Sequence, residues 1–149
     1  MSAGRDAAAA PRLVVATRNP GKVREFARLL AAYPWRLHSV DDTGIVGDLE
    51  EPGPGYTENA VAKAVAVAGA TECAALADDS GIEVLALHGW PGPQSARWRG
   101  PDASDEDRLR GLLDEVARRT PDDRRCRYVC VVAVNTSPPA ASPAWAGNE

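Results

Sequence analysis

The feature of this sequence that most constrains its fold is an alternation of short apolar runs with amphipathic helical stretches. The apolar run at 13–17 is rich in β-branched residues, which predicts a buried strand, and a turn cluster at 18–21 follows it. Apolar residues then recur at the spacing of one helical face, at Val23, Phe26, Ala27 and Leu30. Alternation of this kind predicts an α/β fold with a mixed sheet.

The rest of the chain continues this alternation. Two more helices are expected, one capped by Thr57 and running to about Gly69, the other capped by Ser104 with a buried stripe of Leu109, Leu112, Leu113 and Val116. Further strands are expected at 35–40, 73–78, 82–87 and 128–134, with a turn at 79–81. The long segment 41–55, called the acidic loop below, separates the second strand from the second helix, and loops of this length are often functional.

Length and composition exclude several classes of protein. The 149 residues fit one domain, expected at 13–149 after a loose tail at 1–12. The apolar stretches are too short to span a bilayer, and a net charge of −4 argues against a general binder of the nucleic-acid backbone. Three cysteines without a CxxC spacing suggest neither a disulfide framework nor a zinc site, so reduced thiols in a cytoplasm are expected.

The first candidate site is the segment between the first strand and its helix, called the 17–22 loop below. Ligands of α/β proteins gather at the carboxyl ends of strands, where helix N-termini favour anions. The loop offers polar side chains, a glycine that permits close backbone approach, and a cation: Thr17, Arg18, Asn19, Pro20, Gly21 and Lys22. It lacks the spacing of a Walker A motif, and an ordinary turn with Asn19 as the helix cap is the alternative.

The second candidate site is an acidic pair, Asp78 and Asp79, followed by Ser80 and Gly81. Adjacent carboxylates repel each other unless a cation or a proton lies beside them. The two side chains are expected to point in different directions, so that one can bind a metal while the other accepts a proton from water. A carboxylate of the acidic loop, at Glu50 or Glu51, can complete an oxygen-rich Mg²⁺ shell. A solvated turn and a solvated acidic loop are the alternatives.

Lysine usage points to the same segments. Only two of the seventeen basic residues are lysines, Lys22 and Lys63, and both lie near these acidic or polar motifs. A compact ammonium on a flexible stem differs functionally from a planar guanidinium, so retained lysines can mark places where a point charge is needed. Chance is the alternative. Lys63 also follows Asn59 by four residues, which places both on one helical face.

Taken in order, these motifs resemble the Ham1 family of inosine/xanthosine triphosphate pyrophosphatases. The family pattern T-x-N-x-x-K matches Thr17, Asn19 and Lys22, and its second pattern, an acidic loop and F-x-E-N-A-x-x-K-A, matches residues 51–64. The pattern D-D-S-G-L-x-V matches 78–84, and G-x-P-G-x-x-S-A-R-[YW] matches 89–98. Four motifs in the right order and spacing are specific, and the resemblance extends from Leu13 to Val134.

The resemblance implies an elongated α/β fold with two lobes and a nucleotide cleft between them, and a homodimer. It also implies a cytoplasmic enzyme that uses Mg²⁺ to hydrolyse ITP, dITP and XTP to the monophosphate and pyrophosphate, without a nucleic-acid or membrane partner. Carried over by position, Asp79 is the general base, and Glu50, Asp78 and Asp79 are the metal ligands. The 17–22 loop, Lys63 and Ser80 are expected to bind the substrate.

The sequence departs from the family at its end. The family patterns F-G-[YW]-D-P and S-H-R are not found before Glu149, so we expect a C-terminally shortened domain. The segment 143–147 is expected to begin a returning strand. The alternative function is therefore a weak or inactive form that at most binds metal and phosphates.

Overall fold

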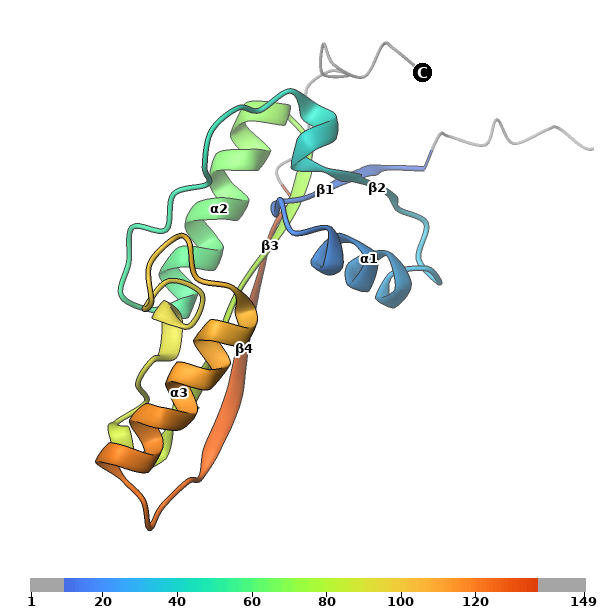
Figure 1. Ribbon diagram of the computed structural model, residues 1–149. Coiled ribbons are helices and arrows are strands. Elements are labelled where there is room, and N and C mark those ends of the chain that lie inside the picture. Colours follow the sequence, from blue (N-terminus) through green and yellow to red (C-terminus); the bar gives the residue numbers. More distant parts are fainter. Residues whose placement is uncertain (1–9, 137–149) are drawn as a thin grey trace, which may run out of the picture.

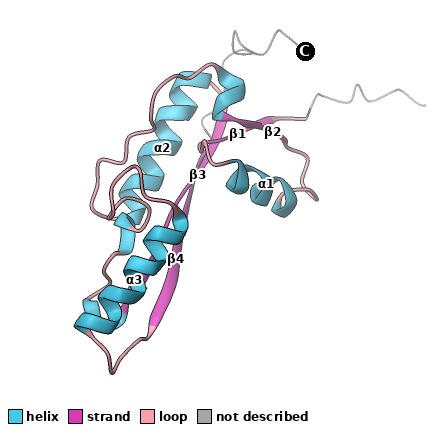
Figure 2. Cartoon of the chain, viewed as in Figure 1, coloured by secondary structure: helices cyan, strands magenta, loops and turns pink. Residues whose placement is uncertain are grey.

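The computed structural model describes residues 10–136 and has a four-stranded sheet and three α-helices in that range (Figure 1). Strands and helices alternate in the first half of the chain (Figure 2). The strands are β1 (Arg12–Val15), β2 (Arg36–Ser39), β3 (Ala74–Val84) and β4 (Cys126–Asn135), and the helices are α1 (Pro20–Leu29), α2 (Tyr56–Thr71) and α3 (Asp105–Arg119). The α/β class is confirmed.

The sheet is mixed, as predicted, with the strand order β2-β1-β3-β4. β1 pairs in parallel with β2 and with the first part of β3, whereas β3 pairs with β4 in antiparallel register from Ala75↔Asn135 to Val84↔Cys126. The β3–β4 ribbon therefore continues far beyond the end of β1. The molecule is accordingly elongated, with α2 and α3 along this ribbon and β1, β2 and α1 beside its upper part (Figure 1).

Alternate side chains of β1 enter two separate cores because successive residues of a strand face opposite sides of a sheet. Val14 packs with Val67 of α2 in one cluster, and Val15 packs with Leu76, Phe26 and neighbouring residues in the other. β1 is thus buried on both faces, which explains its uninterrupted apolar run. This burial holds the start of the 17–22 loop in a fixed position.

A third cluster forms around α3, at the other end of the ribbon. Leu112 and Val116 are buried there, against Val84 and the two rings Trp90 and Trp98. The prediction that Leu109 and Leu113 are buried too is wrong, since they are 57% and 56% exposed. The helix touches its core along a narrower stripe than its apolar pattern suggests.

Two local predictions are also wrong. Residues 79–81 do not form a turn, because Ser80 and Gly81 continue the antiparallel ladder opposite Cys130 and Val129. The tendency of Asp, Ser and Gly to form turns is overridden by pairing with a distant strand. The N-cap of α2 is Gly55 rather than Thr57, which lies inside the first turn.

Some predictions fall outside the described residues. The expected tail is described only for residues 10–12, of which Arg12 begins β1. The expected returning strand at 143–147 lies wholly outside. In the described part of the chain, no helix is both long and apolar enough to cross a membrane.

The close contact between β3 and the loop at 91–95 leads to a first prediction. A Cβ added at Gly81 would collide with the backbone carbonyl of Gly92 and lie 2.7 Å from Ser95 Oγ. We expect Gly81→Ala to lower the free energy of unfolding by about 1–3 kcal/mol, because this packed backbone has little room to move. Urea denaturation measures the change.

Gly69→Ala is the matched control, since no atom lies within 4 Å of its added Cβ in α2. It should leave stability unchanged or raise it by up to about 1 kcal/mol, as is usual for helical glycines. Equal stability of the two variants would contradict the close contact at Gly81.

Candidate functional site

The candidate site lies at a gap in the strand pairing of β3. On one edge of β3, pairing with β1 ends at Val15↔Leu76. Further along the same strand, Glu83 bridges Pro91, and the Ile82 amide donates to Ser95 Oγ at 2.9 Å. Asp78, Asp79 and Ser80 lie between these two stretches. Next to them is a cleft of about 490 Å³ whose wall includes Asp79, Ser80, Asn19 and Lys22.

The 17–22 loop enters this cleft as the start of a helix. Asn19 is the N-cap of α1, and its Oδ1 accepts from the amides of Gly21 at 2.8 Å and Lys22 at 3.4 Å. Pro20 occupies the first turn, where its missing N–H costs nothing. The alternative prediction, that Asn19 caps the helix, is therefore confirmed. The cap orients the loop at the cleft, so Asn19 is both a helix cap and part of the lining of the candidate site.

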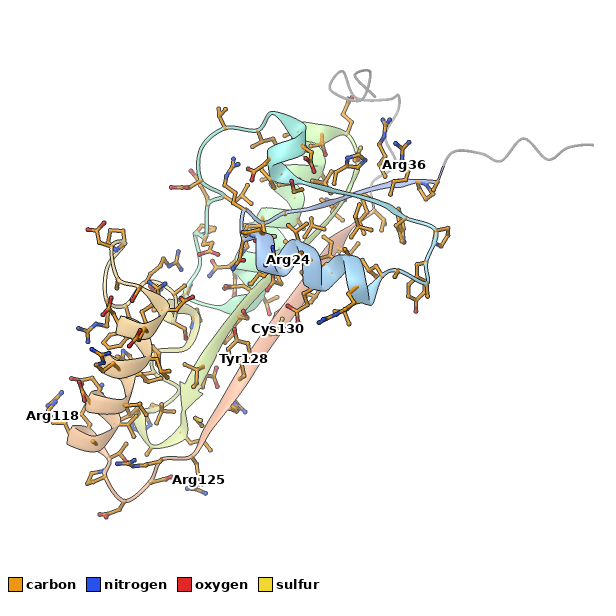
Figure 3. The ribbon with its side chains drawn as sticks, turned by 45° about the vertical axis from the view of Figure 1, so that its right-hand side comes forward. Arg24, Arg36, Arg118, Arg125, Tyr128 and Cys130 are labelled. Atoms are coloured by element: carbon orange, nitrogen blue, oxygen red, sulfur yellow. The ribbon has the colours of Figure 1, made fainter. Side chains whose placement is uncertain are left out.

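Lys22 connects α1 to the acidic pair. Its Nζ lies 2.5 Å from Asp78 Oδ2 and 3.4 Å from Ser80 Oγ, and Ser80 Oγ is 3.2 Å from the hydroxyl of Tyr128. Tyr128 lies in β4 and is 72% exposed. It shares one face of that strand with Cys130 (Figure 3). Asp78 thus forms an ion pair with Lys22 and does not line the cleft itself.

Asp79 points to the opposite face of β3 from Asp78, as the alternation of a strand requires. Its Oδ1 accepts from the Ser80 amide at 3.0 Å, and its Oδ2 accepts from Asn59 Nδ2 at 2.9 Å. Asn59 is fully buried in α2, and its Oδ1 accepts from the Gly53 amide at 2.9 Å. One buried amide therefore orients Asp79 and holds the end of the acidic loop.

The acidic loop brings Glu51, rather than Glu50, to the cleft. Glu51 Oε1 lies 2.7 Å from Lys63 Nζ, and its Oε2 lies 2.5 Å from a guanidinium nitrogen of Arg97. Both cations also line the cleft. Glu50 is exposed and lines a different pocket, between the acidic loop and α2. Adjacent loop residues point in different directions, so only one of the two carboxylates reaches the site.

Other residues of the cleft were not singled out from the sequence. Its lining also includes Asp105, Arg108 and several apolar residues, among them Trp98, which packs edge-on against Trp90 with ring centroids 4.9 Å apart. Arg97 and Trp98 belong to the 89–98 motif, so this motif could have identified them as candidate site residues. Nothing in the sequence distinguished Tyr128, because its place depends on the pairing of β4 with β3.

Arg18 lies beside the cleft and faces away from it. Its guanidinium donates to the carbonyl oxygens of Ile45 and Gly47 and to the carboxylate of Asp41. The side chain of Thr17 accepts from the Asn19 amide at 3.2 Å, and Thr17 and Arg18 line a second, adjoining pocket. Of the residues predicted to bind substrate or metal, the main cleft brings together Asn19, Lys22, Lys63, Asp79 and Ser80.

Two titratable groups near the site stay protonated at neutral pH. Burial raises the pKa of the Cys130 thiol, with the Asp78 carboxylate adding to the effect. Burial, followed by the Glu83 carboxylate, raises the pKa of Tyr56 to about 12. Neither the Cys130 thiol nor the Tyr56 phenol is therefore a ready base, whereas the carboxylates of Glu51, Asp79 and Asp105 line the cleft.

The donor set fits a hard divalent cation through Asp79. Within residues 10–136, no group of three carboxylate, thiol or imidazole side chains forms a ready metal cage. Asp78 and Glu51 have cationic partners, whereas in the described part of the chain Asp79 is 6% exposed and accepts only from neutral donors. A buried carboxylate without a cationic partner is costly, and a metal ion would supply the missing charge.

The fold and the cleft together define an elongated mixed-sheet α/β protein in which cationic and carboxylate side chains line one cleft beside a gap in the pairing of β3. The sequence pattern of the Ham1 family matches residues 13–147, and the chain belongs to that family.

Two similar sequences with one shared name and one similar solved structure illustrate the comparison with known proteins. A dITP/XTP pyrophosphatase of Geobacter sulfurreducens is 45% identical over 83% of this chain and 62% of its own length. The corresponding protein of Deinococcus radiodurans is 50% identical over 83% of this chain and 58% of its own length. A solved Ham1 protein from Coxiella burnetii is 32% identical, with a TM-score of 0.78 over 89% of this chain and 67% of that one. The chain thus spans about 60% of the length of these two pyrophosphatases.

The contact between Asn59 and Asp79 leads to a second prediction. Asn59→Asp keeps the shape of the side chain but places a carboxylate against a buried carboxylate. We expect the free energy of unfolding to fall by about 3 kcal/mol at pH 8. The loss should be smaller at pH 4, because a proton shared by the pair can replace the amide donor. Denaturant titrations at the two pH values measure it.

Asn19→Asp is the matched control, because an exposed carboxylate caps a helix as well as an amide does. Its stability should stay within about 0.5 kcal/mol of the parent at pH 8. A loss from Asn59→Asp that does not depend on pH would argue against a direct contact with Asp79.

Proposed function

We propose that this chain hydrolyses non-canonical purine nucleoside triphosphates (ITP, dITP and XTP) to the monophosphate and pyrophosphate, with Mg²⁺ as cofactor. The observation that carries the proposal is the arrangement of one cleft. Lys22 and Lys63 line this cleft together with a buried carboxylate, Asp79, that has no cationic partner among the described residues. The names of the similar proteins support the same reaction.

The triphosphate is proposed to bind along the 17–22 loop. The first turn of α1 presents backbone amides and a positive dipole end, and Lys22 adds a full charge next to Ser80. Lys63, only 9% exposed, approaches the same cleft from α2. These groups offset the negative charge of the phosphates in the ground state and in the transition state alike.

Asp79 and Glu51 are proposed as the metal-holding carboxylates, with Glu51 in place of Glu50 because only Glu51 lines the cleft. When bound, a divalent ion polarises the phosphoryl oxygens and lowers the barrier to phosphate–phosphate cleavage. Metal binding by Asp78 stays a prediction. Unlike Glu51, which is also ion-paired, Asp78 does not line the cleft, and its pair with Lys22 favours a role in positioning that lysine.

Asp79 is also proposed as the general base. Its carboxylate is held by the Ser80 amide and the Asn59 side chain, so its remaining lone pairs have a fixed direction. A fixed carboxylate can orient a water molecule and accept its proton as the water attacks the phosphorus. We further propose, from the family resemblance, a cytoplasmic homodimer.

The cleavage position gives a third prediction. Incubated with ITP and Mg²⁺, the chain should release pyrophosphate and IMP, because water that attacks the α-phosphorus expels pyrophosphate as the leaving group. Ion chromatography of early time points identifies the products. Orthophosphate as the first product would contradict the proposed reaction.

The assigned roles give a fourth prediction. Asp79→Asn should lower kcat by ~10²–10⁴-fold, because the proton acceptor is lost. Binding of tripolyphosphate without metal should be nearly unchanged, since the 17–22 loop is intact. Lys22→Ala should do the reverse and weaken tripolyphosphate binding, because a charge that meets the phosphates is removed.

Steady-state kinetics and calorimetry on both variants separate these outcomes. Equal effects of the two variants on binding and on kcat would contradict the division of roles. Binding of metal and tripolyphosphate by the parent chain without any turnover would instead indicate a binding protein.

A further inference from the structure

Arg18 connects the 17–22 loop to the acidic loop. Its NH2 group donates to the Ile45 carbonyl at 2.7 Å and to the Gly47 carbonyl at 2.8 Å, its Nε donates to Gly47 at 3.1 Å, and its NH1 group pairs with Asp41. These bonds use four of the five N–H groups of a guanidinium. The planar fork is therefore already occupied by protein oxygens.

The acidic loop has few other attachments. In the part of the chain that the structure describes, no backbone–backbone hydrogen bond holds residues 46–52. Ile45 and Leu49 pack at the margin of a core cluster, Glu51 is ion-paired with Lys63 and Arg97, and the Gly53 amide is held by Asn59. Gly44 and Gly47, with φ of 76° and 84°, make the turns that bring the two carbonyls to Arg18. Arg18 is thus the main polar anchor at the upstream end of the loop.

Glu51 lies only four residues beyond the Gly47 carbonyl that Arg18 holds. A pocket of about 330 Å³ separates the two loops, and its wall includes Thr17, Arg18, Glu51 and Lys63. This pocket and the main cleft share Glu51, Lys63 and Arg97. The distance between the 17–22 loop and the Glu51 carboxylate therefore depends on how the acidic loop is anchored upstream as well as on the ion pairs of Glu51.

We propose that Arg18 is a positioning residue that fixes the acidic loop, so that Glu51 stands at a set place opposite the 17–22 loop. This inference rests on the proposed function and deepens it, since it assigns to Arg18 a role in metal affinity rather than in phosphate binding. A lysine cannot replace it, because one ammonium cannot bond two carbonyls and a carboxylate in the plane of a fork. Replacing a residue that orients a metal ligand without binding the metal itself typically changes metal affinity about 10–100-fold.

The test uses the full chain, Arg18→Lys and the matched control Arg28→Lys, an exposed arginine in the last turn of α1. Mn²⁺ affinity is measured by electron paramagnetic resonance, and tripolyphosphate affinity is measured by calorimetry in EDTA. Arg18→Lys should weaken Mn²⁺ binding about tenfold or more and leave tripolyphosphate binding within about twofold. Arg28→Lys should change neither affinity.

Two results would overturn the proposal. One is a loss of tripolyphosphate affinity in Arg18→Met, which removes the charge, with full retention in Arg18→Lys and no change in Mn²⁺ affinity. That pattern would make Arg18 a phosphate ligand. The other is unchanged amide hydrogen exchange over residues 44–51 in Arg18→Lys, where we expect faster exchange.

The exchange measurement also separates this inference from the proposed function. If the parent chain bound neither Mn²⁺ nor tripolyphosphate, the proposed function would fail. Faster exchange in Arg18→Lys would still show that Arg18 anchors the loop, whereas unchanged exchange would remove that role as well.

Discussion

The antiparallel ladder between β3 and β4 is the constraint on which the rest of the molecule depends. It runs from Ala75↔Asn135 to Val84↔Cys126, far past the point where β1 stops pairing with β3. One half of the ribbon carries β1, β2, α1 and α2, and the other half carries the α3 cluster. Because a single ribbon passes through both halves, the gap between them has a fixed shape, and the candidate site occupies this gap.

The site combines rigid and weakly held parts. Asp79 is fixed by the strand and by the buried amide of Asn59, and Lys22 follows a capped helix start. Glu51, by contrast, lies on a long loop whose polar anchors are side chains: Arg18, Asn59 and the two cations paired with Glu51 itself. Segments held by few backbone hydrogen bonds open more easily than strands and helices. Asp79 and the acidic loop are therefore expected to differ in mobility.

Charge balance explains the basic residues around the cleft. In this structure Asp78 pairs with Lys22, and Glu51 pairs with Lys63 and Arg97. A bound complex of metal and phosphates would offer both signs of charge at once, so carboxylates and cations could exchange partners without leaving any of them buried and unpaired. This arrangement favours binding of the metal and the phosphates together.

The α/β class, the three helices and the motifs of the site could be predicted from the sequence, because apolar periodicity, capping residues and motif spacing are local properties. Three features could not be predicted from these local signals. Residues 79–81 are part of one long strand, Glu51 rather than Glu50 lines the cleft, and Arg18 bonds to the acidic loop. Each of these outcomes depends on contacts between segments distant in the chain, and a fifteen-residue loop without periodicity carries no local signal for them.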